Sequence, residues 1–399
     1  MTAYLNALGL VCALGRDQAE VARKLFAGDC SGMREVDGWI PDRRLPVAAV
    51  PGDLLALPGE LEAYHSRNNQ LLYEACLQIA GQIEHAIAEH GRHRVGIVLG
   101  TSTSGIKEAG EGIANYLDDG HFPPSYDYAQ QELSAPANFL ADWLQLSGPA
   151  YVVSTACTSS ARALMSARRL LDMGLCDAVI CGGVDSLCKL TLNGFNALEA
   201  VSGQRCNPFS SNRNGINIGE AAALFLMTRE RNCQGRSIAL LGASASSDAH
   251  HISAPDPKGT GALQSMTKAL DNARLQPAQV DYLNLHGTAT RHNDAMESLA
   301  VHQLFGSQLA CSSSKPMTGH TLGAAGALEA AFCWLSLAAD NTEGRLPPHI
   351  WDGQADPQLP TLNLIDQHHR LPTTGLRRLM SNSFAFGGNN VSLILGDTP

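Results

Sequence analysis

The sequence of 399 residues lacks the features that mark several large classes of protein. None of its 11 cysteines form a Cys-x-x-Cys pair and their number is odd, so neither a zinc site nor a disulfide framework is indicated. Lys and Arg total 28 against 38 Asp and Glu, and a formal net charge of −10 argues against nucleic acid or an acidic membrane surface as the main partner. No apolar run is long enough for a membrane helix, and the apolar start lacks the basic segment of a signal peptide. We therefore expect a cytoplasmic protein with reduced cysteines.

The composition that is present suits a compact α/β enzyme with many tight turns, since 44% of the residues are hydrophobic and 38 are glycine. In the first part of the chain, apolar runs and helical periodicity predict strands over residues 4–11, 94–99, 151–153, 178–184 and 221–228, and helices over 17–26 and 68–90. Residues 35–60 are expected to be irregular, because four prolines interrupt them.

The order of these elements repeats after a polar turn at residues 229–236. The second part opens on a strand from residue 238, and continues with a helix over 267–273, a strand over 280–285, an apolar helix over 323–337 and a strand over 391–395. The repetition concerns element order and not residue identity. It predicts two βαβ-type halves of similar build, residues 1–235 and 236–399.

Cys157 lies where a predicted strand gives way to a predicted helix, in the stretch Tyr151-Val-Val-Ser-Thr-Ala-Cys157-Thr-Ser-Ser. The unpaired N–H groups and the dipole at the start of a helix favour a thiolate over a thiol, and they can also hold a developing oxyanion. Most cysteines beneath a helix are simply small buried side chains. The small polar neighbours of Cys157 favour a nucleophile instead.

Two histidines in the second half are candidate partners of this cysteine. His286 follows a predicted strand in His286-Gly-Thr-Ala-Thr, and His320 precedes a predicted helix in Lys315-Pro-Met-Thr-Gly-His320. Imidazoles at such positions can donate hydrogen bonds to charge that develops on a carbonyl oxygen. Glu329 is the only charged residue in the apolar helix that follows, so it requires a buried partner, and Lys315 is the obvious one.

Four motifs together resemble the β-ketoacyl-acyl-carrier-protein synthases of the elongating kind, and they occur in the order of that family. These motifs are Thr155-Ala-Cys157-Thr-Ser-Ser, His286-Gly-Thr-Ala-Thr, Lys315-Pro-Met-Thr-Gly-His320 and Asn382-Ser-Phe-Ala-Phe386-Gly-Gly-Asn-Asn. The resemblance covers nearly the whole chain. It implies the thiolase-like α/β fold, in which two duplicated βαβαβαββ halves form a five-layer αβαβα sandwich.

The resemblance also implies the roles of individual residues. The family's catalytic Cys-His-His set corresponds to Cys157, His286 and His320, and its lysine and paired acid correspond to Lys315 and Glu329. Phe386 matches the residue whose backbone N–H joins that of Cys157 in an oxyanion hole and whose ring gates the acyl pocket. Residues expected to contact substrate are Thr288, Thr290, Phe384, Gly387 and Gly388.

The implied reaction has two halves. Cys157 first takes an acyl group from an acyl carrier protein as a thioester. Malonyl carrier protein then loses CO2 with help from the two histidines, and its carbanion attacks the thioester. No cofactor and no metal are expected, since the phosphopantetheine arm belongs to the carrier. The family implies a homodimer, or a heterodimer with a chain-length factor of the same fold.

The pattern departs from the family in ways that bear on the carrier and the pathway. Asn207, Ser210 and Ile216 replace an Arg, an Asp and a Phe of the family, which puts the usual carrier-docking arginine in doubt and leaves Arg67 and Arg213 as candidates. The segment Gly38-Trp-Ile and the stretch beginning His65-Ser-Arg67 are more similar to ketosynthases of aryl-polyene pigment clusters than to those of primary fatty-acid synthesis.

Three other functions compete with an elongating synthase. A degradative thiolase would carry a second cysteine near the C-terminal glycine loop, and residues 381–390 contain none. A chain-length factor, which shapes the pocket of an active partner, typically lacks the nucleophile. A hydrolase of the Cys-His-Asn type has no specific support.

Overall fold

The computed structural model describes residues 2–41, 43–231 and 237–398, and the predicted boundary between the halves, at residue 235, lies outside the described residues. The elements of the first half are β1 (Ala3–Cys12), α1 (Gln18–Ala27), β2 (Met33–Ile40), β3 (Arg43–Ala48), η1 (Gly59–Tyr64), α2 (Arg67–Leu77), α3 (Ala80–His90), β4 (Val95–Gly100), α4 (Ile106–Asp119), η2 (Tyr128–Gln131), α5 (Ala135–Leu144), β5 (Ala150–Val153), α6 (Ser159–Asp172), β6 (Ala178–Asp185), α7 (Lys189–Ala197) and β7 (Ala221–Thr228).

The second half follows with the same alternation of strands and helices. Its elements are β8 (Ile238–Ser247), α8 (Thr260–Ala273), η3 (Pro277–Gln279), β9 (Tyr282–Asn284), α9 (Arg291–Phe305), β10 (Ala310–Ser312), α10 (Lys315–Thr318), η4 (Leu322–Ala324), α11 (Ala325–Leu337), β11 (Asn363–Leu364), β12 (Arg378–Phe384), η5 (Phe386–Gly388) and β13 (Asn389–Gly396).

The two halves share one strand order. The first half has the order β5-β4-β6-β7-β1. The second half has β10-β9-β12-β13-β8, with the two-residue strand β11 added outside β10, so in both halves the first strand along the chain lies at the inner side. Short antiparallel pairing between β1 and β8, from Ala3 opposite Leu240 to Leu5 opposite Ile238, links the two sheets. The predicted repetition of element order is therefore visible in the topology.

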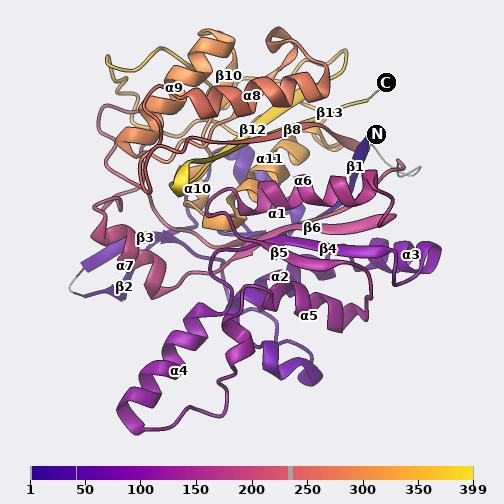
Figure 1. Ribbon diagram of the computed structural model, residues 1–399. Helices are drawn as coiled ribbons and strands as arrows, with labels where there is room; N and C mark the ends of the chain where they lie inside the picture. The colour runs from indigo at the N-terminus through magenta and orange to yellow at the C-terminus, as the bar shows by residue number, and fades with distance from the viewer. Residues whose placement is uncertain (1, 42, 232–236, 399) are drawn as a thin grey trace.

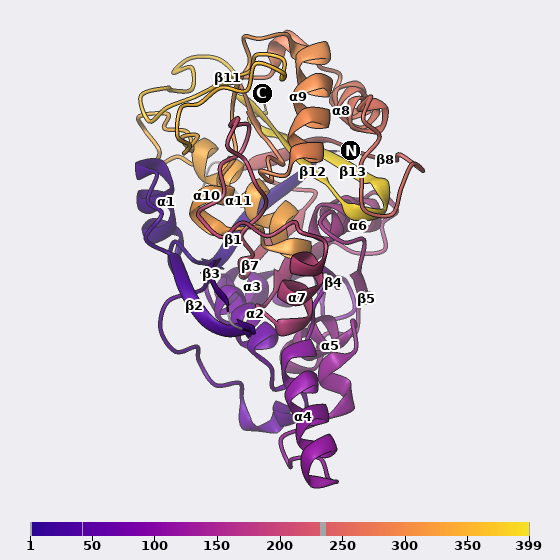
Figure 2. The ribbon, with the colours of Figure 1, turned by 90° about the vertical axis from the view of Figure 1, so that its left-hand side faces the viewer.

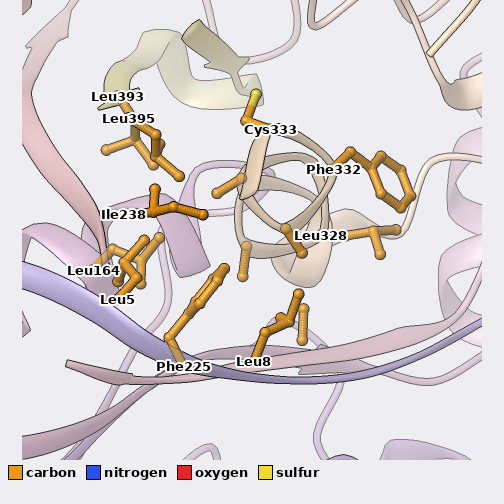
Figure 3. Close-up of a cluster of buried hydrophobic side chains, with 14 of the residues drawn as sticks. Leu5, Leu8, Leu164, Phe225, Ile238, Leu328, Phe332, Cys333, Leu393 and Leu395 are labelled. Atoms are coloured by element: carbon orange, nitrogen blue, oxygen red, sulfur yellow. The ribbon is translucent and has the colours of Figure 1, made fainter. Parts of the chain in front are cut away.

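The layers follow the predicted five-layer sandwich (Figure 1). Helices α8 and α9 cover the outer side of the second sheet, α6 and α11 lie between the two sheets, and α2 and α5 cover the outer side of the first. Figure 3 shows why α11 is apolar all round: Leu328 and Phe332 of this helix lie between Leu8 and Phe225 of one sheet and Leu393 of the other. A helix that is buried on every side has no polar face.

Residues 35–60 are not wholly irregular as predicted. The strands β2 and β3 form a separate two-stranded antiparallel hairpin in which Glu35 lies opposite Pro46. Proline is tolerated there because an isolated hairpin leaves one side of each strand without a neighbour that needs its N–H. Two of the four prolines that predicted a break, Pro41 and Pro46, thus lie beside or within a strand of this hairpin.

The predicted helix over residues 68–90 is in fact two helices, α2 and α3, separated at Gln78 and Ile79. The side chain of Gln78 donates to the carbonyl oxygens of Leu10 and Arg16 and accepts from the Leu10 N–H, so contacts with β1 hold the break. Helix α8 also begins earlier than predicted, at Thr260 and not at residue 267. Both differences reflect tertiary contacts that periodicity does not encode.

The residues of strand β5 are only half-buried, because β5 forms the outer edge of the first sheet. Helix α4 projects from the body of the molecule, as two views at right angles show (Figures 1 and 2). Its tip carries exposed Tyr116 and Leu117 next to exposed Phe122. Among the described residues no helix has both the length and the apolar character needed to cross a membrane.

Candidate active site

Cys157 lies at the turn between β5 and α6, as predicted. Ala156, directly before it, has a φ of 52°, a left-handed conformation that a non-glycine residue adopts at some cost. Cys157 is 7% exposed, and the backbone N–H groups of Cys157 and Phe386 both lie within hydrogen-bonding reach of its sulfur. Two N–H groups that converge on the nucleophile are the arrangement an oxyanion hole requires.

His320 reaches the same point from the second half of the chain. Its Nε2 lies 2.9 Å from the Cys157 Sγ, and its backbone N–H donates to the Asn217 carbonyl at 2.7 Å. The His286 ring lies edge-on to the His320 ring, with centroids 5.3 Å apart. The three residues that sequence separates by up to 163 positions are thus one cluster.

Lys315 and Glu329 form the buried ion pair predicted from the sequence, and both are almost fully buried. The Lys315 ammonium also donates to the His286 carbonyl oxygen and lies 3.5 Å from the His286 Nδ1. An ammonium has only donors, so the nitrogen that faces it must be the acceptor. The proton of neutral His286 is therefore on Nε2, the nitrogen that faces away from Lys315.

Burial determines the charge of the cluster. It lowers the pKa of His286 and of His320 well below the usual range, and the positive charge of Lys315 lowers the pKa of both further. Both imidazoles are therefore neutral, with burial as the main cause. Burial also raises the pKa of Cys157 to about 12, against the lowering effect of Lys315 and the two N–H groups. The prediction that the helix start makes this residue a thiolate is wrong for the free enzyme: the thiol can donate its proton to His320 Nε2.

A cavity of about 590 Å³ opens onto the cluster. Among the residues that line it are Cys157, both histidines and the predicted substrate-contacting residues Thr288, Thr290, Phe384 and Phe386. Gly387 and Gly388 do not line the cavity. Their φ values of 81° and 76° place them in the left-handed region that glycine tolerates, so they shape the turn that presents Phe386.

Two acids that sequence reasoning did not assign hold the His286 loop. Glu297 accepts hydrogen bonds from the backbone N–H groups of His286 and Gly287, at 2.8 and 2.7 Å, and Asp294 accepts from that of Ala289 at 3.2 Å. Both acids lie on the buried side of α9, three residues apart. Their spacing of three residues, which puts them on the same helix face as the buried Val301, was the signal that could have found them.

Arg67 and Arg213, the candidates for carrier docking, are already engaged. Arg67 donates to Glu220, which is fully buried, with Nε to Oε2 at 2.8 Å. Arg213 is itself buried and pairs with Asp356 at 2.5 Å. Both arginines hold loops together. Arg213 is too buried to present a docking surface, whereas Arg67 is partly exposed and its docking role stays a prediction.

The ligand atoms of Cys157, His286 and His320 lie within 4.8 Å of one another, close enough to hold a metal ion. Both imidazoles are neutral, as metal ligation requires, but the cysteine ligand would have to lose its proton first. The absence of a metal from the reaction therefore remains a prediction.

Comparisons with known proteins agree with this geometry. The sequence profile described as "Beta-ketoacyl synthase, N-terminal domain" matches residues 67–233, and "Beta-ketoacyl synthase, C-terminal domain" matches residues 238–350. Nodulation protein E of Rhizobium leguminosarum bv. trifolii is 30% identical over 98% of this chain and 97% of its own length. The 3-oxoacyl-[acyl-carrier-protein] synthase 2 of Synechocystis sp. is 31% identical over 80% of this chain and 79% of its own.

Solved structures extend the likeness to the fold. A chain in the complex of the ketosynthase ApeO with its chain length factor ApeC, from Xenorhabdus doucetiae, is 45% identical, with a TM-score of 0.93 and coverage of 100% of this chain and 98% of that one. The two domain profiles match in the order of the family, and the Cys-His-His cluster lies between the two halves. Together with the sequence matches, this shows that the chain belongs to the β-ketoacyl synthase family of acyltransferases.

Proposed function

We propose that this chain catalyses the decarboxylative condensation of a Cys157-bound acyl group with malonyl carrier protein. The observation that carries the proposal is the contact of the Cys157 thiol with neutral His320 beside neutral His286. The thiol passes its proton to His320 as it attacks the acyl thioester, and the leaving thiol of the carrier takes a proton in turn. The N–H groups of Cys157 and Phe386 hold the oxyanion.

The second half-reaction uses the same cluster once the acyl group is in place. The thioester sulfur no longer donates to His320, so the neutral imidazole can carry its proton on Nε2 in place of Nδ1 and donate from there. The Nε2–H groups of His286 and His320 then stabilise the enolate that forms when malonyl thioester loses CO2. The enolate carbon attacks the Cys157 thioester, the bond between the acyl carbon and the sulfur breaks, and the Cys157 thiolate that leaves takes up a proton. No step requires a cofactor or a metal, and we place the protein in the cytoplasm, in keeping with ten free cysteines in the described residues.

For the pathway we propose aryl-polyene synthesis. The support is the 45% identity to a chain of the ApeO–ApeC complex, against 30–31% for Nodulation protein E and for the synthase of Synechocystis sp.. We also propose that the chain pairs with a partner of the same fold, either a second copy or a chain-length factor. The half-buried edge strand β5 and the exposed apolar tip of α4 are surfaces such a partner would cover.

The direct test is mass spectrometry of Cys157 after incubation with a panel of acyl carrier proteins in the presence of a chelator, with sedimentation of the same preparation. We expect an acyl adduct on Cys157, condensation on adding malonyl carrier protein, and a dimer or larger species. A chain that is never acylated would instead be a chain-length-factor-like subunit. Activity lost to the chelator would contradict the metal-free mechanism.

A separate prediction concerns the carrier. Arg291 is exposed at the cavity rim and makes no ion pair with any other described residue, although Asp356 lies near enough to feel its charge. Acyl carrier proteins are acidic, so Arg291→Glu should raise KM for carrier-bound substrate on the order of five-fold, as for an exposed charge contact. KM for a small thioester surrogate should not change.

Lys268→Glu is the matched control, because Lys268 is exposed on α8 and does not line the cavity. If Arg291→Glu lost activity equally on carrier-bound and small substrates, the defect would lie in the active site itself, and Arg291 would have no role in docking the carrier.

A further inference from the structure

The buried carboxylate of Asp185 is the most densely bonded acid near the active site. It ends strand β6, is fully buried, and accepts six hydrogen bonds from the described residues. Five come from the loop after β4, that is, from Thr101, Ser102 and Thr103. The sixth comes from the backbone N–H of Gly323, at 2.5 Å.

Gly323 belongs to the second half of the chain, so the sixth hydrogen bond joins the two halves. It lies three residues after His320, in η4 at the start of α11. Cys157 belongs to the first half, so the 2.9 Å contact between Cys157 and His320 depends on how the halves are aligned here. Asp185 bonds to both sides of that junction.

Other hydrogen bonds cross the junction close by: the Gly323 N–H also donates to the Ser102 hydroxyl at 3.3 Å, and the His320 backbone pairs with Asn217 and Gly219 of the first half. The Ser160 hydroxyl, in the first turn of α6 and three residues after Cys157, accepts from the Ala327 N–H of α11 at 2.8 Å. Ser160 is also packed tightly, since a Cβ on Gly100 would come within 2.2 Å of the Ser160 N. The Ser160 bond ties the segment that carries the nucleophile to α11, and the Asp185 bond ties β6 and the loop after β4 to the segment that carries His320.

We propose that Asp185 is a positioning residue that aligns His320 of the second half with Cys157 of the first. It does so through the Gly323 N–H and the loop after β4, and it does not line the cavity, although its charge also raises the pKa of Cys157. The inference rests on the proposed function, because it predicts that the two half-reactions depend on Asp185 to different extents. Acylation needs Cys157 and His320, which lie in different halves, whereas decarboxylation relies on His286 and His320, which lie in one.

The two oxygens of Asp185 make the test selective. Oδ1 accepts from the Thr101 and Thr103 hydroxyls and the Ser102 and Thr103 N–H groups, and Oδ2 accepts from the Ser102 hydroxyl and Gly323. An asparagine with its oxygen in the Oδ1 position keeps four of these bonds and turns an NH2 group toward the Gly323 N–H. Asp185→Asn therefore opposes the cross-half bond while retaining the loop.

The experiment measures the rate of Cys157 acylation and the rate of CO2 release from malonyl carrier protein on the same preparations. Misplacement of reacting groups by about 1 Å can cost on the order of 100-fold, so we expect acylation in Asp185→Asn to fall roughly 10- to 100-fold, with its KM unchanged. CO2 release should stay within about two-fold of the parent. Asp185→Glu, which keeps the charge, should recover part of the acylation rate.

Ser160→Ala removes the hydrogen bond from the Ala327 N–H. It should lower the ratio of the acylation rate to the rate of CO2 release, but less than Asp185→Asn does. The proposal therefore stays testable if Asp185→Asn does not fold. Asp397→Asn alters a buried carboxylate that pairs with Arg377 away from the cavity and should leave the ratio unchanged. Equal losses in both half-reactions, or no loss in either, would overturn the positioning role. A parent enzyme without either half-reaction would instead overturn the proposed function.

Discussion

Cys157→Ala will abolish condensation and yet retain measurable release of CO2 from malonyl carrier protein. The acyl chain must wait on the sulfur while the second carrier arrives, so no other group can replace the nucleophile. Decarboxylation needs only a bound malonyl thioester and hydrogen-bond donors on its carbonyl oxygen. His286 and His320 both line the cavity and remain in this variant.

The histidine variants are expected to behave in the opposite way. His286→Ala or His320→Ala keeps the thiol but should slow decarboxylation by a factor on the order of 10²–10³, as for the loss of one oxyanion donor. His320→Ala should also slow acylation, because His320 Nε2 is the group in contact with the Cys157 sulfur.

The measurement is a CO2-release assay beside an acyl-transfer assay on all variants. Cys30→Ala serves as a control, since Cys30 is a half-buried cysteine that does not line the cavity. If both histidine variants released CO2 at the parental rate while Cys157→Ala did not, the assigned roles would be wrong.

Lys315→Ala will destabilise the protein and impair decarboxylation together. It leaves Glu329 buried without its cation, a change that typically costs about 3–5 kcal/mol of unfolding free energy. Lys107→Ala, which breaks an exposed pair with Glu111, should change the unfolding free energy by less than about 1 kcal/mol.

The loss in Lys315→Ala should grow with pH. Burial already raises the pKa of Glu329 to about 7, and removal of Lys315 raises it further. Above pH 4.5, Glu329 is protonated to a greater extent in the folded protein than in the unfolded chain. The free energy of unfolding therefore falls as the pH rises from 4.5 through the folded-state pKa. Chemical unfolding of the parent and the variant at pH 6 and pH 8 should show the larger difference at pH 8.

The double variant Lys315→Met with Glu329→Gln separates stability from catalysis. It removes both buried charges, so much of the lost stability should return. Decarboxylation should remain impaired, because no ammonium then keeps the proton of His286 on Nε2. Normal melting and normal turnover in Lys315→Ala would show that the pair matters for neither.

Much of the active site was predictable because its residues lie at the ends of elements, where short motifs mark them. Cys157, His286 and His320 each stand beside small or hydroxyl residues at a turn, and the lone charge of Glu329 in an apolar helix pointed to Lys315. The thiolate was wrongly predicted because local sequence shows the helix start and not the depth of burial, which dominates the pKa.

The errors in the fold have the same origin. Prolines predicted irregular structure over residues 35–60, but whether a strand is an edge strand depends on what lies beside it. Here β2 and β3 form a two-stranded sheet of their own, and only the end of β3, at Ala48, also pairs with Gly219. The break between α2 and α3 depends on Gln78 bonding to β1, which periodicity cannot register. Arg213 was taken for a surface residue because its partner, Asp356, is more than 140 positions away.

The sequence by itself determined the family, the order of the repeated elements and the reacting groups, because these depend on local motifs and on hydrophobic periodicity. Only the tertiary structure decided which carboxylates serve the site. Asp185, Asp294 and Glu297 look like ordinary acids in the sequence, and each acquires its role from backbone N–H groups that folding brings to it. A hydrogen bond between the halves has no local signature, since it depends on how two sheets and the helices between them pack.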